Sequence, residues 1–272
     1  MVIPAYAGAL NTRTQRETAL ITGASSGIGR DLARLMAADF DLILVARGRD
    51  QLGELRKELE SQHSTRVHVM PADLSRAEAP DGLFAEITRR GLQVDILINN
   101  AGFGVYGRFS ATKSPDELRM IQLNITTLTH LTKLALPGML ERKHGRILNV
   151  ASTAGFQPGP LMAVYYATKA YVISFSEAIA NELKGSGVSV TCLCPGPTAT
   201  EFASHAKVDK SQLFKRVAMS SLIVARAGLE GMLRGKTLVI PGARNKVVAQ
   251  SARFAPRKLV TAISRKILES TG

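Results

Sequence analysis

A tyrosine and a lysine, Tyr165 and Lys169, stand four residues apart, and Ser152 precedes the tyrosine by thirteen residues. On a helix, side chains at this spacing share one face, with Cβ atoms about 5–6 Å apart. An ammonium about 5 Å from a phenol contributes on the order of 3 kcal/mol at an effective dielectric near 20. That is enough to lower a tyrosine pKa by the roughly 2–3 units that proton exchange near neutrality requires. We therefore predict that Tyr165 has a lowered pKa and donates a proton, and that Ser152 donates a hydrogen bond to a substrate oxygen.

Tyr166 is the competing phenol. It points about 100° around the same predicted helix, and the residue four positions on is Ala170 rather than a lysine. We assign Tyr166 to packing or to the pocket wall.

A second segment, residues 22–29, reads TGASSGIG and places Gly23, Gly27 and Gly29 between an apolar run and a predicted helix. Glycines permit a tight turn and let a pyrophosphate approach the backbone closely. The free amides and positive dipole end of the helix that begins there favour an anion. A glycine-rich turn can also serve chain reversal alone, and this spacing differs from the common G-x-G-x-x-G fingerprint. On its own, the segment leaves both interpretations open.

Short apolar runs alternate with longer amphipathic segments along the chain. We predict strands over residues 19–21, 42–45, 67–69, 96–98, 147–150, 188–193 and 238–240, and helices over 28–38, 51–60, 77–90, 115–142 and 164–184. Continuous apolar strands are typical of parallel sheets covered on both faces. The pattern predicts an α/β fold, a single-domain Rossmann-like doubly wound parallel sheet with helices on both faces. We divide the chain into an N-terminal extension (1–16), a catalytic domain (17–242) and a basic helical tail (243–272) packed on or near the substrate pocket.

The chemically interesting segments all follow predicted strands. The glycine segment follows the first strand, Asn99 ends the fourth, Ser152 follows the fifth, and Pro195 and Gly196 follow the sixth. Ligands on doubly wound sheets bind beyond the carboxyl ends of the strands. We therefore expect these segments to meet at one edge.

Four motifs now stand in order: T-G-x-x-x-G-x-G, N-N-A-G at residues 99–102, Ser152, and Y-x-x-x-K. In these motifs, residues 17–242 resemble the compact, single-domain branch of the short-chain dehydrogenase/reductase family. The resemblance implies a catalytic set of Asn124, Ser152, Tyr165 and Lys169, with Asn124 holding a water that links to Lys169. It implies a homodimer or homotetramer. It also implies a nicotinamide cofactor bound through Gly23, Ser25, Ser26, Gly27, Ile28, Gly29, Asp73, Asn99, Ala101, Gly102, Tyr165, Lys169, Pro195, Gly196, Thr198 and Thr200.

Three of these residues have more specific implied roles, and one of the three has an alternative. Asp73 would hold the adenine edge, but it can equally cap a helix that begins near Ala77. Asn99 would support the adenosine side, and Thr200 is a candidate to bind the nicotinamide carboxamide.

The identity of the cofactor depends on the end of the second strand, where an acid would favour NAD. That place holds Arg47, whereas Asp41 lies at the other end of the strand. An arginine can form a paired, charge-assisted contact with a 2′-phosphate, and Arg30 could help. The alternative is that these arginines are only solvated. We predict cofactor binding by Arg47 and a preference for NADP(H) over NAD(H).

We expect an NADP(H)-dependent oxidoreductase that interconverts a carbonyl and a secondary alcohol. The alternative is a catalytically silent NADP(H)-binding sensor or scaffold of the same fold. Segments 103–109, 153–162 and 202–214 should line an apolar pocket suited to a lipophilic substrate. The residues they offer are Phe103, Tyr106, Phe156, Leu161, Met162, Phe202 and Phe214. The five histidines show no metal-site spacing, so we expect no metal.

The net charge of +13 is concentrated in residues 226–272, which carry +8 of it. Aromatic residues are scarce there, so we expect no nucleic acid. The tail can cap the pocket, join a neighbouring subunit or make weak contact with an anionic membrane surface. Cys192 and Cys194 lie in one apolar run, where core packing suits them better than a disulfide between residues two apart. A reduced, cytoplasmic protein is the expectation.

Overall fold

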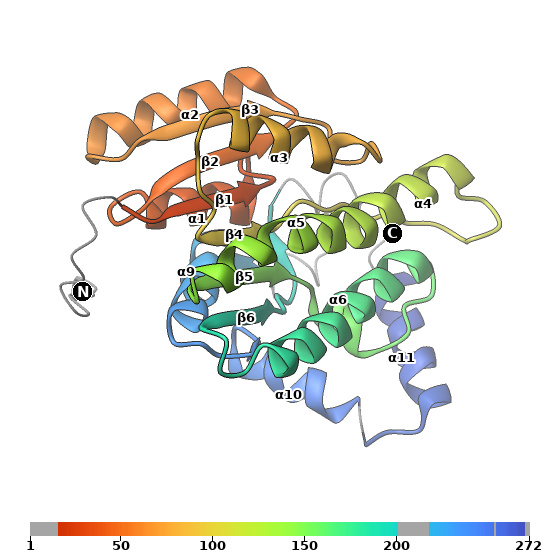
Figure 1. The fold of residues 1–272 in the computed structure, drawn as a ribbon. Coiled ribbons are helices and arrows are strands. Elements are labelled where there is room, and N and C mark those ends of the chain that lie inside the picture. The colour runs from red at the N-terminus through yellow and green to blue at the C-terminus, as the bar shows by residue number, and fades with distance from the viewer. Residues whose placement is uncertain (1–15, 201–217, 253, 270–272) are drawn as a thin grey trace.

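A seven-stranded parallel sheet forms the centre of the protein in the computed structural model, which describes residues 16–200, 218–252 and 254–269 (Figure 1). The strand order is β3-β2-β1-β4-β5-β6-β9. The strands are β1 (Thr18–Thr22), β2 (Asp41–Ala46), β3 (Val67–Pro71), β4 (Ile96–Asn99), β5 (Gly145–Val150), β6 (Val188–Leu193) and β9 (Leu238–Val239). The expected doubly wound sheet is confirmed, and β1 and β4 flank the point where the strand order reverses.

Helices cover both faces of this sheet. They are α1 (Gly27–Met36), α2 (Arg49–Gln62), α3 (Ala79–Arg89), α4 (Ser114–Ile121), α5 (Leu128–Glu141), α6 (Ala163–Glu182), α9 (Ser221–Leu233), α10 (Ala243–Ser251) and α11 (Arg257–Glu269). Buried side chains of α1, α2 and α9 form one core layer, and those of α3 and α5 form the other, against which Ile179 and Ala180 of α6 pack. Neighbouring strand residues alternate between the layers, as Leu20 and Ile21 do, which is why the strands are apolar throughout.

The predicted long helix over residues 115–142 is present as one continuous helical segment, but its middle part is not α-helical. Between α4 and α5 it passes through a π-helical segment, η1 (Gln122–Thr127). Short π segments in helices are frequent at functional sites, and Asn124 lies in this one. A 3-10 turn, η2 (Thr153–Phe156), follows β5, and a small two-stranded sheet pairs β7 (Thr198–Ala199) with β8 (Met219–Ser220).

The basic tail forms α10 and α11, which lie below and beside α6 in Figure 1. In α11, Val260, Ser264 and Leu268 are buried and recur every four residues, so one face of this helix packs on the protein. Within the described residues, no helix combines the length and apolar character needed to span a bilayer. The predicted extension lies, apart from Arg16, outside the described residues.

Candidate active site

The turn between β1 and α1 has the backbone conformation expected of a phosphate cradle. Gly23 and Gly27 have positive φ values of 66° and 51°, which side chains rarely adopt. A Cβ on Gly29 would lie 2.3 Å from the Gly23 carbonyl oxygen, so α1 can start this close to β1 only with a glycine there. The residues present therefore fit a dinucleotide whose phosphates approach the backbone.

The first turn of α1 is left open for an anion. Ser26 is the N-cap residue, but its side chain makes no capping hydrogen bond, and no acidic residue lies in the first turn. Ser25 and Ile28 are half-buried beside it. Free amides at a helix N-terminus bind phosphate, and the cofactor contacts of Ser25, Ser26 and Ile28 stay predictions.

Two residues that sequence reasoning did not place in the site hold the cradle against β4. Asn100 donates from Nδ2 to the carbonyl oxygens of Thr22 (2.9 Å) and Gly23 (3.2 Å). The Thr22 hydroxyl accepts from the backbone amides of Asn100 (2.9 Å) and Ala101 (3.0 Å). Both residues belong to the T-G and N-N-A-G motifs, and this was the sequence signal that could have identified them. Their hydrogen-bond partners are backbone groups distant in sequence, so the motifs alone did not reveal the role.

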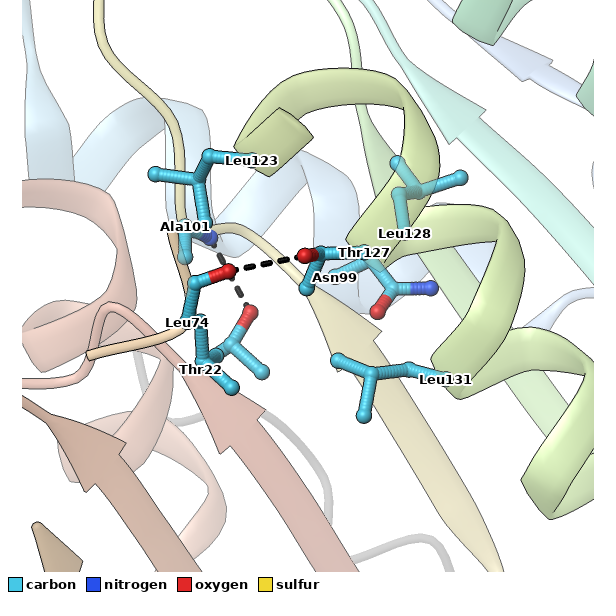
Figure 2. A pocket seen from close by; sticks show the side chains of 8 residues that line it. All are labelled: Thr22, Leu74, Asn99, Ala101, Leu123, Thr127, Leu128 and Leu131. Atoms are coloured by element: carbon cyan, nitrogen blue, oxygen red, sulfur yellow. Dashed lines mark hydrogen bonds between the residues drawn. The ribbon is translucent and has the colours of Figure 1, made fainter. Parts of the chain in front are cut away.

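Asn99 and Ala101 border a small internal cavity behind the cradle (Figure 2). Asn99 Nδ2 donates to Thr132 Oγ1 (3.1 Å) and to Asn149 Oδ1 (2.9 Å), so this amide links β4 to α5 and β5. Figure 2 also shows Thr127 donating to the Leu74 carbonyl at 2.7 Å. Asn99 thus has a structural role here, and its contact with the adenosine side stays a prediction.

Asp73 does not cap a helix, and that alternative is wrong. The helix α3 begins at Ala79 with Glu78 as its N-cap. Asp73 instead accepts hydrogen bonds from the Ser75 hydroxyl (2.7 Å) and amide (3.1 Å) in a turn. These hydrogen bonds hold the pKa of Asp73 below its usual value, and the charge of Arg47 helps. Arg47 is exposed and close enough to act on Asp73, so both lie at the edge predicted for the adenosine end.

The segment after β6 closes over the cradle. The Pro195 carbonyl accepts from the Thr153 amide at 2.8 Å, which ties this segment to η2. Thr198 donates to the Gly196 carbonyl at 2.9 Å. A Cβ on Gly27 would meet Thr200 at 3.0 Å, so Thr200 lies directly against the turn. The structure therefore brings the predicted residues 195–200 to the glycine turn.

Ser152, Tyr165 and Lys169 lie together at the end of β5, as predicted. Tyr165 and Lys169 are both buried on α6, and the Tyr165 hydroxyl forms a side-chain hydrogen bond with Ser152. Lys169 Nζ lies 5.8 Å from the centre of the Tyr165 ring and donates to the Val150 carbonyl at 2.9 Å. Ser152 also accepts from the Ala154 amide at 3.1 Å, which fixes its rotamer at the start of η2.

The predicted lowering of the Tyr165 pKa is wrong for the protein chain alone. Burial raises the pKa of Tyr165 above its usual value, and the hydrogen bond with Ser152 offsets only part of that effect. Burial also lowers the pKa of Lys169 to about 8. Desolvation disfavours the charged form of either group, and the spacing of the two residues in the chain does not reveal this cost. A raised pKa keeps Tyr165 protonated, which is the state that a proton donor needs.

Asn124 connects η1 to the active-site helix. Its Nδ2 donates to the Phe103 carbonyl (3.0 Å) and to Thr168 Oγ1 (3.1 Å), and its Oδ1 accepts from the Phe103 amide at 3.2 Å. A Cβ added to Gly102 would lie 2.9 Å from Asn124 Oδ1 and 3.6 Å from Lys169 Nζ. Gly102 thus separates the two side chains, and the water predicted between them stays a prediction.

We expect Gly102→Ala to lower both the melting temperature and the turnover number. Its methyl group must displace the Asn124 side chain, whose Oδ1 would lie only 2.9 Å away, and overpacking of this kind costs about 1–3 kcal/mol. Gly53→Ala and Gly82→Ala are matched controls, because no atom lies within 4 Å of a Cβ at either position. Both lie inside helices, where the change should stabilise by about 0.5–1 kcal/mol. Thermal unfolding of the three variants checks this, and equal shifts for all three would contradict it.

An apolar cluster surrounds the Tyr165 ring. It comprises Met120, Ala154, Met162, Tyr165 and Leu268, with Phe103, Val105, Tyr106, Leu161, Val164 and Tyr166 packed against it. The Tyr166 ring meets that of Tyr165 edge-on, with centroids 6.1 Å apart, which agrees with a packing role. Phe156 is partly buried and packs in another cluster, with Val172, so its lining of the substrate pocket stays a prediction. Phe202 and Phe214 lie outside the described residues.

The expected core role of the two cysteines agrees with the structure. Cys192 and Cys194 are buried and free, with their sulfur atoms 3.7 Å apart. They lie under α6 in the cluster that includes Val172.

A doubly wound sheet whose carboxyl edge carries a glycine cradle and a Ser–Tyr–Lys cluster defines the class of nicotinamide-dependent dehydrogenases and reductases. Residues 17–211 match the model of the short chain dehydrogenase family. The chain belongs to the short-chain dehydrogenase/reductase family, whose members are oxidoreductases.

Known proteins agree with this assignment. The chain is 30% identical over 246 residues to a very-long-chain 3-oxoacyl-CoA reductase of Rattus norvegicus, covering 88% of this chain and 77% of that protein. A protein of the same name from Phaeosphaeria nodorum is 36% identical over 180 residues, 64% of this chain, and the match spans only 53% of that protein. The structure of a short-chain dehydrogenase from Sphingobium yanoikuyae in complex with NADPH is 34% identical, with a TM-score of 0.78 over 88% of this chain and 94% of that one.

Proposed function

We propose that this protein is an NADP(H)-dependent reductase that interconverts a lipophilic carbonyl compound and its secondary alcohol. One observation carries the proposal: Ser152, Tyr165 and Lys169 lie together at the sheet edge that also bears the glycine cradle. Packing alone does not require a buried lysine beside a buried phenol, because both groups lose hydration there.

The residues of the site divide the work of carbonyl reduction. A nicotinamide bound across the cradle would supply or accept the hydride. Ser152 donates a hydrogen bond to the substrate oxygen, where charge grows as the carbonyl is reduced. Tyr165, kept protonated by burial, gives its hydroxyl proton to the same oxygen. Lys169, whose Nζ lies 5.8 Å from the centre of the Tyr165 ring, stabilises the phenolate left on Tyr165.

The arginines near the cradle support NADP(H). Arg30, in the first turn of α1, has its Nε buried without a hydrogen-bond partner among the described residues. A buried guanidinium nitrogen without a partner is costly, and a 2′-phosphate would satisfy it. The acid of β2, Asp41, is engaged with the side chain and amide of Arg66, both at 2.9 Å, at the opposite end of the strand.

Arg30→Ala is expected to weaken NADPH binding by about 10–100-fold, the worth of a charge-assisted hydrogen bond. Binding of NADH should change by less than about threefold, because it lacks the 2′-phosphate. Arg34→Ala is the matched control, since Arg34 lies one turn on and is paired with Glu58 at 2.8 Å. Cofactor titrations of the two variants measure the effect. Equal losses for NADPH and NADH would contradict the preference.

The substrate class follows from the wall around Tyr165. Leu161, Met162 and Leu268 make this wall apolar, which suits an aliphatic or aromatic carbonyl. The names of the rat and fungal relatives, which specify a very-long-chain acyl substrate, support the same class. The test is NADPH oxidation with carbonyl compounds of rising chain length. Rates that are equal for short polar and long apolar substrates would contradict a lipophilic site, and no turnover on any would favour a silent cofactor-binding protein.

A further inference from the structure

The helix α11 carries two apolar stripes, and within the part of the chain that the structure describes one is buried and the other is exposed. Val260, Ser264 and Leu268 are buried. Leu259, Ile263 and Ile267 also recur every four residues, but they are 52%, 51% and 44% exposed. Repeats of four residues lie along one side of a helix, so the second stripe is a continuous apolar surface. Phe254, just before the helix, is 88% exposed.

Basic side chains are frequent on α11 and in the segment around it. Lys258, Arg265 and Lys266 are exposed. Lys266 lies beside Leu259 on the helix surface, whereas Lys258 and Arg265 lie on the polar side of α11, about 100° or more around the helix from the stripe. Arg265 pairs with Glu269 at 2.8 Å. Residues 243–272 contain seven lysines and arginines and a single acid, Glu269. The helix therefore combines an exposed apolar stripe with a strongly positive segment.

We propose that the exposed face of α11 docks on an anionic lipid surface. An interfacial helix places its apolar side chains at the acyl boundary while basic residues reach the headgroups. Anionic lipid attracts such basic segments. A second copy of this chain fits less well, since a two-fold contact would bring together two segments that each carry seven basic residues and one acid. Nucleic acid would leave the apolar stripe without a partner.

The docking face adjoins the candidate active site. Leu268 is one residue from the exposed Ile267, and it packs in the cluster that contains Tyr165. The Tyr106 hydroxyl donates to the Leu268 carbonyl at 3.0 Å, which fixes the end of α11 over that cluster. A lipid surface held here would lie beside the apolar wall of the pocket. The docking itself does not depend on the proposed reductase activity.

Sedimentation of the full chain with vesicles tests the proposal. We expect the protein to pellet with vesicles of phosphatidylcholine and phosphatidylglycerol, less with phosphatidylcholine alone, and less at high salt. Leu259→Ser combined with Ile263→Ser should lower the partition coefficient at least about tenfold, because two large apolar side chains are lost. Lys258→Gln combined with Lys266→Gln should remove much of the preference for anionic lipid.

Leu222→Ser combined with Ile223→Ser is the matched control. These residues of α9 are 42% and 56% exposed, so the same kind of apolar surface is removed elsewhere. This control should keep vesicle binding, and circular dichroism with NADPH titration establishes that every variant is folded. The proposal is overturned if the control loses as much binding as the α11 variant. It is also overturned if the unaltered protein ignores vesicles and the α11 variant converts a dimer to a monomer.

Discussion

Replacing Tyr165 with phenylalanine is expected to lower kcat for carbonyl reduction by about a thousandfold, within the range for loss of a general acid. The change removes one oxygen from a ring whose packing against Met120, Met162 and Leu268 remains. We expect the Kd for NADPH to stay within about threefold, because the cradle and Arg30 are untouched. Steady-state kinetics and cofactor titration on the same preparation separate the two effects.

The matched control is Tyr166→Phe. Tyr166 is the neighbouring residue, the centre of its ring lies 6.1 Å from that of Tyr165, and it is half-buried. Burial raises its pKa to about 12, but Ser152 does not act on it. This variant should keep kcat within about threefold of the original, since it loses no reacting group. Full activity in Tyr165→Phe, or the same loss of activity in both variants, would contradict the proposed role of Tyr165 as the proton donor.

The fold was predictable because its strands are buried on both faces. Such strands appear in sequence as short apolar runs, of which Leu42–Val45 is an example, and their order in the chain leaves few topologies. The site was predictable because parallel strands end at one edge. Ser152 and Gly23 therefore come together although 129 positions separate them in the chain. The motif spacing indicated which residues could react or bind, and the topology of the sheet explains why they lie at the same edge.

The features of the site that the sequence did not predict depend on contacts between residues that are distant in the chain, and no local sequence pattern indicates them. Asn100 clamps the cradle through the Thr22 and Gly23 carbonyls, which lie 78 and 77 residues away. The π-helical turn at Asn124 has no sequence signature comparable to a helix cap. Burial of Tyr165 involves Leu268, more than a hundred positions later. The four-residue spacing of Tyr165 and Lys169 therefore indicates their mutual attraction but not the desolvation that raises the tyrosine pKa.

Replacing Lys169 with methionine is expected to lower kcat by about a hundredfold or more, because the phenolate of Tyr165 loses the positive charge beside it. Methionine has a similar length and no charge, so the apolar surroundings of α6 should accept it. The Val150 carbonyl loses its hydrogen-bond donor, which costs stability by about 1–3 kcal/mol at every pH. Activity alone therefore cannot separate a catalytic lysine from a structural one, but the pH dependence of stability can.

Burial lowers the pKa of Lys169 from 10.5 to about 8. Between these values the unfolded chain binds more protons than the folded one, so this group makes the free energy of unfolding rise with pH. The rise is on the order of 3 kcal/mol, complete near pH 10.5, and absent below about pH 8, where both states are protonated. In Lys169→Met the rise should disappear and leave only the constant offset from Val150. Urea unfolding of both proteins across this pH range measures the difference, and parallel curves would show that Lys169 has an ordinary pKa.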